Sequence, residues 1–91
     1  MQTAAKVSVM KRLKRIEGQV RGLARMVEHD RYCIDIVTQL SAVRAALRRA
    51  EEEILADHVA YCVEQAITSG NKAQQRRKVA ELTGVLRRSE R

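Results

Sequence analysis

The sequence predicts an all-α protein with three helices per chain, and two chains are expected to pair as an antiparallel four-helix bundle. Pro is absent from the 91 residues and Gly occurs only four times, so long helices meet few breaks. Phe and Trp are also absent, which leaves an aliphatic core of the kind that helical bundles use. A chain this short buries a modest fraction of its surface, so we expect one domain, 1–91, that associates with other copies.

The first helix is expected from about Lys6, after a disordered segment at residues 1–5. Its apolar positions recur at alternating spacings of four and three, which is typical of one buried face of an amphipathic helix. These positions are Val9, Leu13, Ile16, Val20, Leu23 and Val27. Most of the basic residues of this segment fall outside that face, with Arg12 at its border.

The second helix follows a short connection at residues 29–31, with Asp30 as the expected N-cap. From Arg31 to Cys62 the chain has neither Pro nor Gly and is rich in Ala, Leu, Arg and Glu, so one uninterrupted helix is predicted. The short connection makes the first two helices an antiparallel hairpin, and two hairpins complete the four-helix bundle.

The last helix is expected at residues 72–88. Gly70 supplies a C-terminal signal for the helix before it, and Asn71 with Gln74 resembles a cap for the helix after it. The apolar stripe of this helix, formed by Val79, Leu82 and Leu86, is narrow. This helix must therefore dock on the bundle.

Both cysteines and one of the two histidines lie on the second helix. At about 100° per residue, His58 and Cys62 project within roughly 20° of the direction of Cys33, yet they lie about 37 to 43 Å away along the axis. These three metal-ligating side chains share a face and cannot meet within one straight helix. They can meet if two helices pack antiparallel, with Cys33 of one chain beside Cys62 of its partner.

This antiparallel register makes further pairs that are chemically consistent. It sets apolar against apolar and acid against base, with Leu40 opposite Leu55, Val37 opposite His58 and Arg44 opposite Glu51. A lone buried Cys is usually a small hydrophobic residue, and a lone His is usually a core residue. His58 and Cys62, however, are neighbours at i and i+4 and can bind one ion together. A metal or reactive-thiol site is therefore predicted.

The charge of +7 is unevenly distributed. Residues 1–31 hold eight Lys or Arg against three acids, residues 32–64 hold three against six, and residues 65–91 hold seven against two. Two basic arms around a mildly acidic helix suggest a nucleic-acid partner. No apolar run is long enough to span a membrane and no signal-like segment opens the chain, so a cytoplasmic protein with reduced cysteines is expected. No catalytic arrangement of Ser or His is present, so an enzyme is not expected.

Three motifs carry a resemblance to a known family. RLKRIEGQVRGL at residues 12–23, DRYCIDIVTQLSAV at residues 30–43, and DHVAYC followed by SG within residues 57–70 closely resemble the copper-sensing operon repressors and their relatives, the CsoR/RcnR family. The resemblance covers residues 8–88. It implies an all-α dimer that pairs into a homotetramer, binds operator DNA as a repressor and responds to a metal or to thiol stress.

Within this family, the ligand set Cys33, His58 and Cys62 resembles the Cu(I) branch. Two thiolates and an imidazole suit a soft monovalent ion. Nickel and cobalt sensors have His in place of Cys62 and a further His near the amino terminus, and residues 1–10 contain none. Persulfide sensors lack the equivalent of His58. The resemblance therefore implies a repressor that binds DNA in the metal-free form and is released by Cu(I).

The resemblance also assigns the remaining site residues. Tyr32 and Glu81 correspond to the pair that couples the metal to DNA, although residues 71–78 are longer and more basic than the usual link before Glu81. Contact with DNA is assigned to four basic residues, Arg12, Lys14, Arg15 and Arg49. Two alternatives stay open: a persulfide-sensing repressor of the same family, and a copper-buffering protein with no role on DNA.

Overall fold

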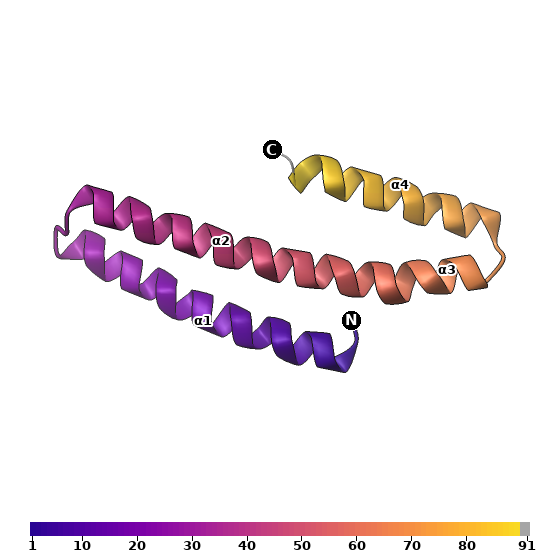
Figure 1. Ribbon diagram of the computed structural model, residues 1–91, viewed down its shortest axis with the longest axis horizontal. Helices are drawn as coiled ribbons and strands as arrows, with labels where there is room; N and C mark the ends of the chain where they lie inside the picture. Colours follow the sequence, from indigo (N-terminus) through magenta and orange to yellow (C-terminus); the bar gives the residue numbers. More distant parts are fainter. Residues whose placement is uncertain (90–91) are drawn as a thin grey trace. The chain divides into compact units, whose positions relative to one another are not determined.

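The computed structural model describes residues 1–89, and it is entirely helical over that range. Helix α1 spans Thr3–Glu28 and helix α2 spans Cys33–His58. A π-helical segment, η1 (Val59–Val63), and helix α3 (Glu64–Thr68) continue directly from α2, and α4 spans Lys72–Ser89 (Figure 1). Residues 33–68 thus form one helical stretch, and the predicted all-α fold of three helices is confirmed over the described residues.

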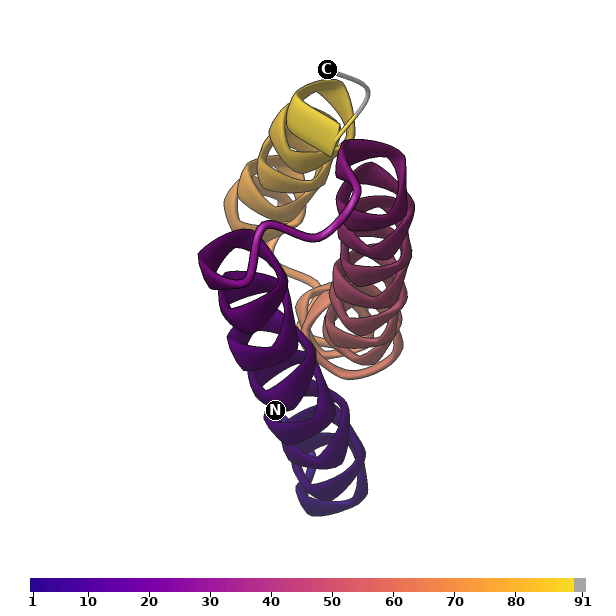
Figure 2. The same ribbon diagram turned by 90° about the vertical axis from the view of Figure 1, so that its left-hand side faces the viewer.

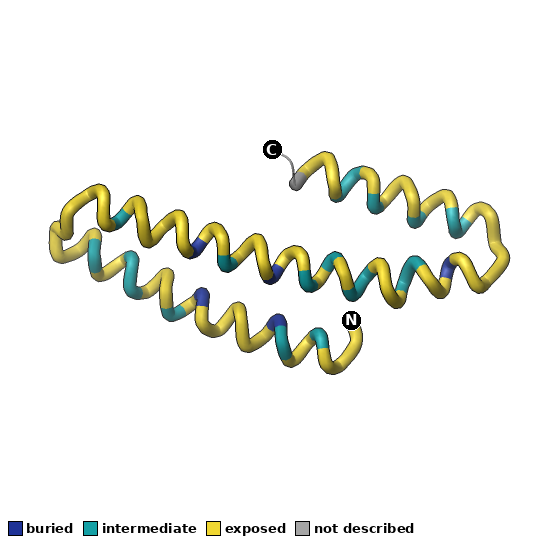
Figure 3. The backbone as a smooth tube through the Cα atoms, viewed as in Figure 1, coloured by how far each residue is buried: buried dark blue, intermediate teal, exposed yellow. Residues whose placement is uncertain are grey.

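The chain divides into two compact units, the first at Met1–Ala56 and the second from Asp57 onward. In the first unit, α1 and α2 lie side by side and antiparallel, as both views of the ribbon show (Figures 1 and 2). Val9 and Ile16 of α1 and Val43 and Ala50 of α2 are the buried residues of this hairpin, and they lie on the sides where the two helices face each other (Figure 3). The predicted helical hairpin is therefore confirmed.

The apolar face predicted for α1 is only partly buried. Leu13, Val20 and Val27, which alternate with the buried positions, are 38%, 49% and 60% exposed. The helix also begins earlier than expected, because Thr3 and the two residues after it are helical where a disordered segment was predicted. Α single copy of α2 thus covers about half of the apolar face of α1.

The turn between α1 and α2 corrects the prediction for Asp30. This residue has a φ of 53°, in the left-handed region, and it terminates α1 rather than capping α2. The Arg31 N–H donates to the Met26 carbonyl at 2.9 Å and the Asp30 N–H donates to the Val27 carbonyl at 3.1 Å, the two bonds of a Schellman motif. Tyr32 instead precedes α2, and its carbonyl accepts from the N–H of Asp35.

The turn before α4 agrees with the prediction. Gly70 has a φ of 71°, where a residue without Cβ is favoured, and its N–H donates to the Ile67 carbonyl. The Asn71 side-chain oxygen then accepts from the Gln74 N–H at 3.1 Å, which makes Asn71 the N-cap of α4. Gln75 adds side-chain bonds to the Ala66 and Ile67 carbonyls and so ties α4 to α3.

The outer face of α2 carries a stripe of exposed apolar residues. Val37, Leu40, Leu47 and Ile54 are between 40% and 56% exposed, and they share one face at heptad spacing. Over the described residues, the buried hydrophobic residues number only five, and Ala66 is the single one in the second unit. Such a small core leaves the stripe as an apolar surface that a second copy can cover.

None of the helices within residues 1–89 is long and apolar enough to cross a membrane.

Candidate metal site and nucleic-acid surface

The predicted metal ligands lie at the two ends of α2 and in the segment after it. Cys33 is the first residue of α2 and is exposed, and His58 is its last residue. The shared direction of Cys33 and His58 stays a prediction. Cys62 lies in η1, where hydrogen bonds span five residues instead of four, so the predicted uninterrupted α-helix up to Cys62 is wrong.

His58 has a carboxylate neighbour on α4. Its Nε2 lies 3.4 Å from Oε1 of Glu81, and Oε2 of Glu81 lies 3.8 Å from Nζ of Lys78. The His58 side chain is 27% exposed and that of Glu81 is 51% exposed. A carboxylate beside one ring nitrogen orients the imidazole and leaves the other nitrogen, Nδ1, available to bind a metal ion. This contact joins His58, a predicted metal ligand, to Glu81, which was predicted to couple the metal to DNA.

Cys62 is four residues beyond His58 and is partly buried, while both cysteines are free thiols. No group of three or more His, Cys, Asp or Glu side chains within residues 1–89 is placed to hold a metal ion. The sharing of Cys33, His58 and Cys62 between two copies stays a prediction. The chemistry of the donors, two thiols and one imidazole, is that of a soft-metal site.

Tyr32 lies immediately before Cys33 and is 68% exposed. Its carbonyl accepts from the N–H groups of Asp35 and Ile36 and so closes the first turn of α2. The backbone of Tyr32 thereby fixes where α2 begins.

Three of the four residues predicted to contact DNA line one pocket between α1 and α2. Arg12, Arg15 and Arg49 surround a volume of about 110 Å³, together with Ile16, Gln19 and Ala46. Lys14 is exposed on α1 and is not among the residues that line the pocket. Three arginines that line one small pocket make a cationic site for an anion.

Arg12 is also held by an acid of α2. Its Nε donates to Oε2 of Glu53 at 2.8 Å. Hydrogen bonding from the Ser8 hydroxyl and from Arg12, together with the charge of Arg12, lowers the pKa of the Glu53 carboxyl, and partial desolvation opposes that shift. Ser8 and Arg12 are i and i+4 on α1, a spacing that could have indicated a shared partner.

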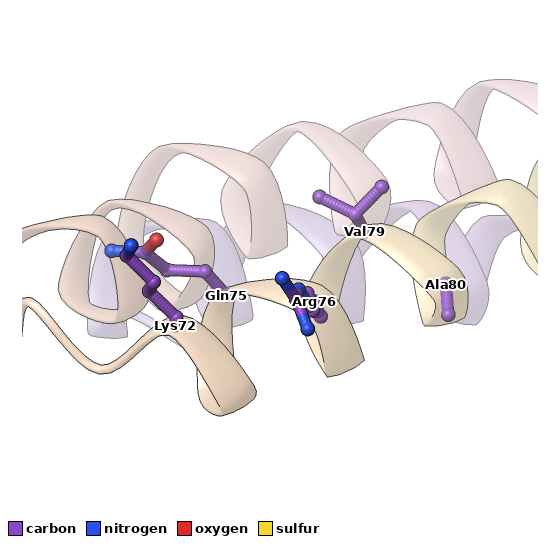
Figure 4. Close-up of a pocket in the computed structure, with 5 residues that line it drawn as sticks. All are labelled: Lys72, Gln75, Arg76, Val79 and Ala80. Atoms are coloured by element: carbon purple, nitrogen blue, oxygen red, sulfur yellow. The ribbon is translucent and has the colours of Figure 1, made fainter.

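A second basic surface lies on α4. Lys72, Gln75, Arg76, Val79 and Ala80 line a shallow pocket of about 530 Å³, and Figure 4 shows these side chains along successive turns of the helix. Val79 is 63% exposed beside these cations. The sequence indicated this surface only as part of a general basic bias in residues 65–91.

Comparison with known proteins identifies the family. A family described as metal-sensitive transcriptional repressors matches residues 5–88. The chain is 48% identical over 83 residues to the copper-sensing transcriptional repressor CsoR of Bacillus subtilis, covering 91% of this chain and 79% of that protein. It is 45% identical over 86 residues to the copper-sensing transcriptional repressor RicR of Mycobacterium tuberculosis, covering 94% of this chain and 88% of the relative.

A solved structure agrees over the same range. The crystal structure of the copper-sensing repressor CsoR with Cu(I) from Geobacillus thermodenitrificans superimposes with a TM-score of 0.90 at 43% identity, covering 100% of this chain and 92% of that chain. The helical hairpin and these matches together lead to one conclusion. The chain belongs to the family of metal-sensitive transcriptional repressors.

Proposed function

We propose that this protein is a Cu(I)-responsive repressor, which binds operator DNA in its metal-free form in the cytoplasm and leaves the DNA when Cu(I) binds. The observation that carries this proposal is the contact between Nε2 of His58 and Glu81. It orients an imidazole one helical turn before Cys62, so that Nδ1 and a thiolate can act as neighbouring ligands.

Cu(I) would be held by His58 and Cys62 of one protomer and by the partner's Cys33. Two thiolates and an imidazole match its preference for soft ligands, and the bound ion would cross-link the two protomers. The similarity to repressors named as copper-sensing supports this choice of metal. The ligand set also distinguishes the protein from a persulfide sensor, because an oriented imidazole has no role in joining two thiols through sulfur.

The exposed stripe on α2 supports a dimer in which two copies of this helix pack antiparallel. Val37, Leu40, Leu47 and Ile54 lie on the face that carries His58, and Cys33 lies at its start. Pairing of two such faces would bury the stripe and bring the partner's Cys33 toward the site. We extend this assembly to a homotetramer because association of two dimers would also bury the exposed apolar residues of α1.

The DNA surface of the proposed repressor includes Arg12, Arg15 and Arg49, with Lys14 beside them. The sequence contains no helix-turn-helix motif with an obvious recognition helix. We therefore assign binding to phosphate contacts and to the shape of the operator, read by a broad basic face.

The proposal is tested by fluorescence anisotropy on the DNA upstream of the protein's own gene, with Cu(I) added under reducing conditions. The metal-free protein is expected to bind and Cu(I) to release it at a fixed stoichiometry. His58→Ala should bind the DNA but lose the release. His29→Ala is the matched control, because His29 is the other histidine and lies exposed in the turn after α1; it should behave as the parent.

Two results would contradict the proposal. Release by a persulfide donor with no response to Cu(I) would make the protein a sensor of reactive sulfur. Tight Cu(I) binding without any binding to DNA would make it a copper-buffering protein.

A further inference from the structure

The contacts of Arg12 differ from those expected of a residue that only meets DNA. Arg12 is bound by Glu53 through Nε at 2.8 Å. Glu53 is in turn hydrogen-bonded by Ser8, one turn before Arg12 on α1. The Glu53 side chain is 26% exposed and that of Arg12 is 43% exposed. One carboxylate on α2 is thus held by two residues of α1, at the edge of the arginine pocket.

The geometry of this ion pair leaves the pocket open to another anion. The Nε bond uses one of the five N–H donors of the guanidinium, and the other four lie on Nη1 and Nη2. Arg12 lines the pocket with Arg15 and Arg49, whereas Glu53 is not among the lining residues. The carboxylate therefore binds Arg12 from outside the pocket and does not occupy the pocket.

The size of the pocket limits what it can accept. A volume of about 110 Å³ equals that of a few water molecules, each of which occupies about 30 Å³ in the liquid. A phosphate group is a compact anion, which suits a small pocket lined by arginines. Arginine guanidinium groups bind phosphate oxygens through paired N–H donors.

We infer that Glu53 is a positioning residue, which holds Arg12 so that its Nη groups join Arg15 and Arg49 around one backbone phosphate of the operator. The inference rests on the proposed function. Free arginine side chains lose rotamer entropy when they bind. Glu53 removes part of that loss beforehand because it fixes the guanidinium in the unbound protein. Ser8 supports the carboxylate from the neighbouring turn.

The test compares operator binding by Glu53 variants with binding by variants of Glu17. Glu17 forms an exposed ion pair with Arg21 at 2.9 Å, entirely within α1, so its removal changes the net charge equally. Glu53→Ala is expected to bind the operator about three- to tenfold more weakly than Glu17→Ala, as the loss of one preorganised side chain implies. Glu53→Gln should match Glu17→Gln, because its amide oxygen still accepts from Nε of Arg12.

A double variant links the effect to Arg12. In the Arg12→Ala background, adding Glu53→Ala should change operator affinity no more than adding Glu17→Ala does. Ser8→Ala, which leaves the net charge unchanged, should weaken operator binding by a smaller factor. Thermal unfolding of each variant is measured alongside, and Ser8→Ala is the deciding variant if Glu53→Ala does not fold.

The outcomes separate this inference from the proposed function. Glu53→Ala that binds DNA as tightly as Glu17→Ala, or more tightly, would overturn it, and tighter binding would mean that the carboxylate competes with phosphate. If Arg12→Ala weakens binding while the Glu53 and Ser8 variants do not, only the inference fails. If Arg12→Ala leaves binding unchanged, the proposed role of Arg12 on DNA fails as well.

Discussion

At the scale of single residues, the Glu53 carboxylate shows how one side chain contributes to both folding and binding. The Ser8 hydrogen bond and the neighbouring Arg12 lower its pKa below the ordinary value of 4.5. Both partners come from α1, so ionisation of Glu53 is linked to docking of α1 on α2. A carboxyl whose pKa is depressed in the folded state stabilises that state above its unfolded pKa, and this contribution is lost as the pH falls through the folded pKa.

The first prediction follows from that linkage. The free energy of unfolding of the parent protein should fall as the pH is lowered from about 5 through the depressed pKa of Glu53. Glu53→Gln should show a smaller fall over this range, because the amide does not titrate. Urea denaturation at a series of pH values measures the difference, with Glu17→Gln as the control. Parallel curves for parent and Glu53→Gln would show that the Glu53 contacts are not linked to folding.

The second prediction concerns Asp30 and its left-handed backbone. Replacement by Gly should give a protein about 1 kcal/mol more stable than replacement by Ala, because only Gly adopts a positive φ without a steric cost. At Lys11, an exposed position inside α1, the order should reverse, since Gly is the poorer helix former. Thermal unfolding of the four variants measures both differences. The same order at both positions would contradict the turn geometry.

At the scale of helices, the sequence predicted best where the chain carries strong local signals. Gly70 and Asn71 marked the end of one helix and the start of the next, and α4 begins at Lys72 as expected. Asp30 was misassigned because Asp is common both at N-caps and in the left-handed region, so its identity alone does not distinguish the two. The π-helical segment could not be predicted, since VAYCV contains neither Pro nor Gly to mark a change of helix type.

The third prediction concerns the contact between His58, the last residue of α2, and Glu81 of α4. On the proposed function, Cu(I) shifts the protein toward a state with low DNA affinity, and Glu81 is the α4 residue that contacts His58. Glu81→Ala should keep the Cu(I) stoichiometry and lose a large part of the Cu(I)-dependent release from DNA. The coupling free energy between two binding sites is typically about 1 to 3 kcal/mol, and the variant should lose a large part of it. Tyr32→Phe should act in the same direction.

The measurement is the ratio of operator affinities without and with Cu(I). Glu64→Ala is the control, since Glu64 is an exposed acid on α3. Full release in both the Glu81 and Tyr32 variants would mean that the ligands alone transmit the signal.

At the scale of the whole molecule, the sequence predicted a metal site shared by two chains, and a single chain contains only part of such a site. Helical periodicity predicted Cys33 and His58 on one side of a helix, and they are the first and last residues of α2. Completion of the site needs a second copy, so the pairing of Cys33 with Cys62 stays a prediction. Glu53 was missed because its role depends on how α1 packs against α2, and one helix's periodicity does not reveal contacts made by its neighbour.

The fourth prediction tests the shared site directly. Cys33→Ala homodimers and His58→Ala, Cys62→Ala homodimers should each bind Cu(I) poorly, because every site lacks at least one ligand. When the two proteins are mixed and allowed to exchange subunits, heterodimers should regain one intact site each. Chelator competition on the isolated heterodimer measures this gain. Equal Cu(I) binding by mixed and unmixed species would exclude the antiparallel arrangement.

The exposed stripe of Val37, Leu40, Leu47 and Ile54 has a consequence for the abundance of the protein. In the proposed assembly this surface is covered only when copies meet, so folding and association are governed together by mass action. The midpoint of thermal unfolding should therefore rise with protein concentration. In a cell that holds few copies, dilution alone would favour separated chains, and the number of molecules would limit repression before any copper arrived.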